Sequence, residues 1–98
     1  GITIDLSHAD FSSLATVGGY AYKNDLIIIR SSDEVYLAFS KVCTHQSCTV
    51  TYDPGSNQMP CPCHGSVLNI NGGVVNGPAP SALKKYLAKK EGNSLTIT

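Results

Sequence analysis

The chain has no excess of charge of either sign, because seven Lys and Arg residues balance seven Asp and Glu residues. With no basic patch in the sequence, nucleic acid is not an expected partner. A long hydrophobic run is also missing, since the apolar stretch Leu26–Ile29 is far too short to span a membrane. The length of 98 residues, free of internal repeats and low-complexity segments, suits one small domain.

A leader sequence is not visible either. The N-terminus carries no signal-peptide pattern, and the chain starts with Gly1 rather than Met. We therefore expect an upstream segment, such as a signal, an anchor or a tag, in the full protein. Membrane association is then expected only through that segment or through partner subunits.

Short runs of alternating or β-branched residues, separated by polar turns, predict an all-β domain with antiparallel strands. In the first part of the chain, strands are expected at Ile2–Leu6, Tyr20–Tyr22, Ile27–Ile29 and Val35–Phe39. The polar segment Ser7–Ser13 between the first two is expected to be a loop.

The amino-acid composition changes after Lys41, because residues 42–80 are rich in Cys, Gly, Pro and Asn. Strands there must be short, and they are expected at Thr49–Tyr52, Val67–Ile70 and Gly73–Val75. This stretch therefore predicts a loop-rich subdomain that holds the functional site.

The tail favours a hairpin, with a turn at Gly92-Asn93, a last strand at Leu95–Thr98 and one helical turn near Ser81–Leu83. Residues 1–98 are thus expected to form a single domain. Its base would consist of residues 1–41 and 81–98, and residues 42–80 would be the inserted subdomain.

Two short boxes hold all four cysteines and two of the three histidines. They are Cys43-Thr44-His45-Gln46-Ser47-Cys48 and Cys61-Pro62-Cys63-His64-Gly65-Ser66. Two thiolates and two imidazoles form a mixed ligand set for a metal, and the two remaining cysteines can form one disulfide. This set matches a [2Fe–2S] centre in which two histidines replace two cysteines on one iron. The third histidine, His8, is expected to be an ordinary surface residue.

Three other interpretations of the cysteines fit less well. A scaffold with two disulfides conflicts with the close spacing of Cys61 and Cys63 and does not explain the neighbouring histidines. A structural zinc finger pairs Cys with Cys and His with His, whereas each box here contains both. A thiol oxidoreductase would be expected to have C-x-x-C spacing, which the second box lacks.

The two boxes resemble those of the Rieske iron–sulfur proteins. The resemblance implies a β-sandwich base with an inserted cluster-binding subdomain and one [2Fe–2S] cluster per chain. The resemblance implies that Cys43 and Cys61 bind one iron and that His45 and His64 bind the other. It also implies a disulfide between the remaining cysteines, Cys48 and Cys63.

Further matches point to one branch of the family. The two disulfide cysteines occur in Rieske subunits of cytochrome bc-type quinol oxidases and are generally missing from Rieske ferredoxins and oxygenases. The segment Gly77-Pro78-Ala79-Pro80 resembles the proline loop that covers the cluster in those subunits. Ser66 matches a hydroxyl that donates to a bridging sulfide, whereas Leu68 replaces a Tyr of the high-potential members. We therefore expect a potential below that of the most oxidising members, which favours a donor such as menaquinol.

The resemblance implies one-electron transfer from a quinol to a c-type cytochrome, beside a cytochrome b subunit, with no catalysis by the chain alone. His64 is the expected quinol contact, although the residues themselves rank it no higher than His45. The disulfide favours an oxidising compartment such as the periplasm. The alternative is a soluble Rieske carrier or small subunit that serves a protein partner such as an oxidase or oxygenase.

Overall fold

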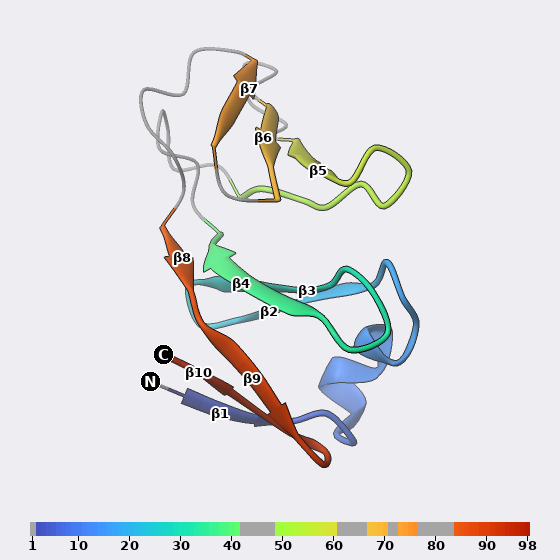
Figure 1. The fold of residues 1–98 in the computed structure, drawn as a ribbon. Helices are drawn as coiled ribbons and strands as arrows, with labels where there is room; N and C mark the ends of the chain where they lie inside the picture. The colour runs from blue at the N-terminus through green and yellow to red at the C-terminus, as the bar shows by residue number, and fades with distance from the viewer. Residues whose placement is uncertain (1, 42–48, 61–66, 71–72, 77–83) are drawn as a thin grey trace.

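The computed structural model describes residues 2–41, 49–60, 67–70, 73–76 and 84–98. These residues form three antiparallel sheets and one 3₁₀-helix, which confirms the predicted all-β class (Figure 1). The first sheet contains the strands nearest both ends of the chain in the order β1 (Ile2–Asp5), β10 (Ser94–Ile97) and β9 (Ala88–Glu91).

The second sheet lies in the middle of the molecule (Figure 1). Its strands are β2 (Tyr20–Lys23), β3 (Leu26–Arg30), β4 (Tyr36–Ser40) and β8 (Lys85–Tyr86), in that order. The third sheet has the order β5 (Gln58–Pro60), β6 (Val67–Asn69) and β7 (Val74–Asn76). All of its strands come from the stretch rich in Gly, Pro and Asn.

The middle sheet is covered on both faces, which explains the continuous apolar run in β3. Side chains alternate between the two faces of a strand. Ile28 packs with side chains of the first sheet, whereas Ile27 and Ile29 pack with Met59 and Leu68 of the third sheet. All three isoleucines are 0% exposed. The three sheets therefore share two hydrophobic cores. The first core lies between the first and middle sheets, and the second core lies between the middle and third sheets.

The predicted loop at Ser7–Ser13 is wrong in part, because a 3₁₀-helix, η1, spans Ala9–Ala15. The helix is kinked at Phe11, where φ is −115° and ψ is 19°. Phe11 and Leu14 are both buried, in the core that the middle sheet shares with the first sheet. His8 caps the helix, since its Nδ1 accepts a hydrogen bond from the Asp10 amide at 3.1 Å. The exposed His8 confirms the expected surface role.

The strand expected at Thr49–Tyr52 is also wrong, because these residues form no strand, and the strand before the second box is β5 instead. Val50 and Tyr52 do bury their side chains in the second core. The backbone of this stretch reaches β5 through the Thr51 amide, which donates to the Pro60 carbonyl at 3.0 Å. The polar and proline residues of β5 gave no strand pattern in the sequence.

The predicted C-terminal hairpin is confirmed. β9 and β10 pair in antiparallel register, with Glu91 opposite Ser94. Gly92 between them has a positive φ of 60°, a conformation that glycine adopts without steric cost. The helical turn expected near Ser81–Leu83 lies outside the described residues.

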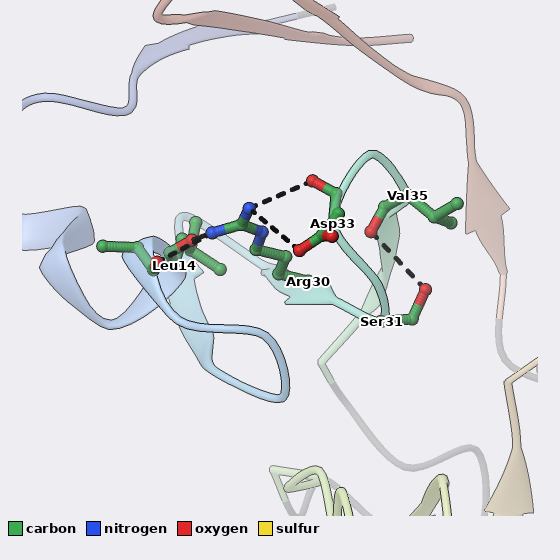
Figure 2. Close-up of polar contacts among 6 residues, drawn as sticks. Leu14, Arg30, Ser31, Asp33 and Val35 are labelled. Atoms are coloured by element: carbon green, nitrogen blue, oxygen red, sulfur yellow. Dashed lines mark hydrogen bonds and ion pairs between the residues drawn. The ribbon is translucent and has the colours of Figure 1, made fainter.

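Arg30, at the end of β3, holds η1 against the middle sheet (Figure 2). Its Nη1 donates to the carbonyls of Leu14 at 3.2 Å and Ala15 at 2.8 Å. Its Nη2 donates to the Asp33 carbonyl at 3.1 Å. The guanidinium also lies 5.7 Å from the centre of the Tyr36 ring. One side chain thus satisfies carbonyls at the end of the helix, where the backbone lacks its own donors.

Replacing this guanidinium should destabilise the fold. We expect Arg30→Met to lower the free energy of unfolding by about 2 kcal/mol, because the carbonyls of Leu14, Ala15 and Asp33 lose a charged donor. Asp33→Asn is the control, since the Asp33 side chain is 88% exposed and its 4.0 Å ion pair with Arg30 is worth little. Urea unfolding measures both variants, and equal losses would contradict the structural role of the Arg30 hydrogen bonds.

Candidate metal centre

The predicted ligands and most of the predicted site residues lie outside the described residues. This set comprises Cys43, His45, Cys48, Cys61, Cys63, His64, Ser66, Gly77, Pro78, Ala79 and Pro80. Leu68 is the predicted site residue that the structure does describe. The residues directly before and after the second box, Pro60 and Val67, are described, as are Lys41 and Val50, which lie two positions from the ends of the first box.

The second box connects two directly paired strands. Pro60 ends β5, Val67 begins β6, and the two residues face each other in the antiparallel register. Val67 also pairs with Asn76, the last residue of β7, after which residues 77–83 follow. Pro60, Val67 and Asn76 therefore lie side by side across the third sheet. They are the two attachment points of the second box and the residue before the segment that contains Gly77–Pro80.

The first box is attached at the same end of this sheet. Lys41 and Val50, two positions before and after this box, are joined, because the Val50 amide donates to the Lys41 carbonyl at 2.8 Å. The next amide, of Thr51, donates to the Pro60 carbonyl at 3.0 Å, immediately before the second box. The ends of both boxes are thus linked by backbone hydrogen bonds. This arrangement brings the attachment points of the boxes together, as a single shared metal site requires.

The base of the molecule contributes a tyrosine that the sequence did not single out. The hydroxyl of Tyr22, on β2, donates to the Val50 carbonyl at 2.7 Å. The Lys41 amide donates to the Asp25 carbonyl at 2.8 Å. The Nζ of the Lys41 side chain lies 5.8 Å from the centre of the Tyr22 ring. Burial, and then the neighbouring Tyr20, raise the pKa of Tyr22 above 10.0. The alternating pattern of β2 predicted a strand and gave no sign of this contact.

Leu68 lies in the second core, two residues after the second box. Its side chain is 0% exposed and packs in the same cluster as Phe39 and Met59. An aliphatic side chain contributes packing here and has no hydrogen-bond donor. The segment leaving the second box is therefore fixed to the middle sheet by apolar burial.

The donor set of the two boxes fits an iron–sulfur cluster. Two thiolates and two imidazoles satisfy the four ligand positions of a [2Fe–2S] centre with mixed ligation, and two cysteines remain. In the part of the chain that the structure describes, no group of three or more His, Cys, Asp or Glu side chains could hold a metal ion. The fold and the boxes together define the class of a small iron–sulfur domain.

Comparison with known proteins gives the family. The model of the Rieske [2Fe-2S] domain matches residues 4–87. The chain therefore belongs to the Rieske [2Fe-2S] domain family, and its cofactor is one [2Fe–2S] cluster. No helix among the described residues is long and apolar enough to cross a membrane.

The curated relatives include iron–sulfur subunits of cytochrome b6-f complexes. The subunit from Chlorobaculum thiosulfatiphilum is 37% identical over 79 residues, which cover 81% of this chain and 44% of that protein. The subunit from Gloeobacter violaceus is 47% identical over 58 residues, which cover 58% of this chain and 31% of that protein. The chain thus spans less than half the length of these relatives.

Solved structures share the fold along the whole chain. The cyanobacterial plasma membrane Rieske protein PetC3 from Synechocystis PCC 6803 has a TM-score of 0.75 at 23% identity, covering 100% of this chain and 99% of that one. The ferredoxin of carbazole 1,9a-dioxygenase from Nocardioides aromaticivorans has a TM-score of 0.76 at 16% identity, with coverages of 100% and 98%. At these identities the likeness shows the fold alone.

The turn that follows the first box is held by a second tyrosine. The Tyr52 hydroxyl donates to Asn57 Oδ1 at 2.5 Å. Burial raises the pKa of Tyr52 above 10.0, and the charge of Asp53 raises it further. Gly18 of the base approaches this turn so closely that a Cβ there would lie 3.0 Å from Pro54 Cβ. The turn is therefore anchored both internally and against the base.

Tyr52→Phe should reveal the pH dependence of this anchor. We expect it to cost about 1 kcal/mol of unfolding free energy at neutral pH, the value of one hydrogen bond. Because the folded-state pKa is raised, this stabilisation is fully present below 10.0 and is lost as pH rises through the raised pKa. Urea unfolding of both proteins at neutral and strongly alkaline pH measures the difference, which should shrink at high pH. A difference that stays constant or grows would contradict this assignment.

Proposed function

We propose that the chain transfers one electron through its Rieske [2Fe–2S] cluster, from a quinol to a c-type cytochrome, beside a cytochrome b subunit. The observation that carries this proposal is the hydrogen-bonded convergence of the two box attachments at one end of the third sheet. The naming of curated relatives as iron–sulfur subunits of cytochrome b6-f complexes supports the choice of partners. The chain alone makes and breaks no bonds.

The proposed ligands are one Cys and one His from each box. Cys43 and Cys61 bind one iron, and His45 and His64 bind the other. Cys48 and Cys63 form a disulfide that joins the boxes, and a disulfide of this kind contributes about 2–4 kcal/mol to stability. The Thr51–Pro60 hydrogen bond supports this arrangement, because it already holds the two attachments in register.

The histidines couple proton transfer to electron transfer. When bound, the cluster supplies a one-electron acceptor, with potentials of roughly −150 to +300 mV across Rieske centres. A histidine that binds iron through one ring nitrogen keeps the other for a proton. Neutral His64 would accept a hydrogen bond and then the proton of one quinol hydroxyl, as one electron is passed on through the bound cluster. The second electron and proton of the quinol would leave through the cytochrome b subunit. By the family resemblance, Gly77–Pro80 would cover this region, and the Ser66 hydroxyl would donate to cluster sulfur.

The disulfide cysteines favour this function over that of a soluble carrier. The fold does not discriminate, because the dioxygenase ferredoxin is as similar in structure as the plasma membrane Rieske protein. Cysteines that form a stable disulfide suit an oxidising compartment. We therefore place the domain on the periplasmic side of a membrane, held there by partner subunits or by an upstream segment.

Analysis of the cofactor and its potential tests the proposal. The purified protein should contain two irons and two acid-labile sulfides per chain. Its midpoint potential should be positive and should fall as pH rises near neutrality, because oxidation of the cluster acidifies the histidines and releases their protons. Redox titration at a series of pH values measures this slope. A low potential that stays flat until strongly alkaline pH would assign the chain to the carrier class instead.

The residue at position 68 should tune the potential. We expect Leu68→Tyr to titrate at a higher potential than Leu68→Phe, because only the tyrosine adds a donor that favours the reduced cluster. Both variants insert a ring at a position that is 0% exposed, so both should lose about 1–3 kcal/mol of stability by overpacking. The phenylalanine variant therefore controls for the steric effect. Equal midpoints for the two variants would show that a hydroxyl at this position does not reach the cluster.

A further inference from the structure

The backbone on both sides of the first box is fixed by the β2–β3 hairpin. Before the box, the Lys41 amide donates to the Asp25 carbonyl in the turn of that hairpin, at 2.8 Å. After the box, the Val50 carbonyl accepts from the Tyr22 hydroxyl at 2.7 Å. The Val50 amide closes the ring by donating to the Lys41 carbonyl at 2.8 Å. We call these three hydrogen bonds the clasp.

Tyr22 is the side chain in the clasp, and its surroundings hold it in place. Its ring meets that of Tyr20 edge-on, with 5.8 Å between centroids and an interplanar angle of 84°. The Lys41 ammonium lies 5.8 Å from the ring centre. Val50, its acceptor, is 0% exposed. A carbonyl on so buried a residue depends on a protein donor, and losing that donor leaves it unpaired or forces it to move.

We propose that Tyr22 is a positioning residue for the cluster, holding the Val50 carbonyl so that the first box keeps a single geometry. The inference rests on the ligand set proposed above, in which this box gives Cys43 to one iron and His45 to the other. A shift at its attachment would change the ligation of both irons at once. Ligand position and the hydrogen bonds around it tune an iron–sulfur centre.

The neighbouring tyrosine offers a matched control. Tyr20 lies on the same strand and shares the ring contact with Tyr22, and its ring also meets that of Tyr52 edge-on at 6.4 Å. In the described part of the structure, its hydroxyl makes no hydrogen bond, whereas that of Tyr22 does. Tyr20→Phe and Tyr22→Phe therefore remove the same atom from adjacent rings, and only the second removes a clasp hydrogen bond.

The test compares the two variants with the wild type as holoproteins. We expect Tyr22→Phe to release its cluster to a chelator several-fold faster, and the EPR spectrum of its reduced cluster to broaden. Tyr20→Phe should match the wild type in both measurements. Hydrogen exchange adds a readout that needs no cluster, because the Val50 amide should exchange faster in Tyr22→Phe while the Ile28 amide in the middle sheet stays protected.

The outcomes separate this inference from the proposed function. A wild-type protein without iron and sulfide would overturn both. A normal wild-type cluster, with Tyr22→Phe and Tyr20→Phe indistinguishable in cluster release and EPR spectrum, would overturn the positioning role alone. A Tyr22→Phe variant that changes only the urea midpoint would also overturn it, because the hydroxyl would then support the fold without positioning the box.

Discussion

The middle sheet buries both of its faces, and the other parts of the molecule depend on this constraint. β3 is short, yet it serves two cores, because Ile28 faces one neighbouring sheet and Ile27 and Ile29 face the other. A strand of this kind has no side free for water, so covering layers are needed on both sides. One layer is the sheet formed by the strands near both termini. The other is the third sheet, which carries both ends of the second box.

This layering connects packing with function. The third sheet is small, and a short three-stranded sheet gains stability by packing on another element. Met59 and Leu68 supply that packing, and they come from the strands that flank the second box. The clasp adds directional bonds at the first box, where apolar burial alone would leave the backbone free to slide. Burial and hydrogen bonding therefore act together at the attachments of both boxes.

The sequence predicted the class of fold and the chemistry of the site from different features. Alternation was enough for β1, whereas β3 and β4 were recognised as β-branched or aromatic runs between polar turns, and the C-terminal hairpin by its turn residues. η1 was missed because two buried residues three apart, Phe11 and Leu14, are a weak pattern in a polar segment. β5 was missed because its residues, Gln58–Pro60, are held by pairing with β6 rather than by intrinsic preference. The donor set could be read directly, but the Tyr22 contact joins residues 28 positions apart and depends on the folded chain.

The chain leaves the base for the third sheet and returns to it through two neighbouring strands, β4 and β8. Ser40 ends β4, and its amide donates to the carbonyl of Lys84, directly before β8, at 2.9 Å. An insertion whose two ends meet disturbs its host little, which is the usual condition for exchanging one module for another. Packing works against such an exchange here, because a base without its insert would present Ile27, Ile29 and Phe39 to water. The chain path is that of a removable module, but the shared core favours base and insert unfolding together.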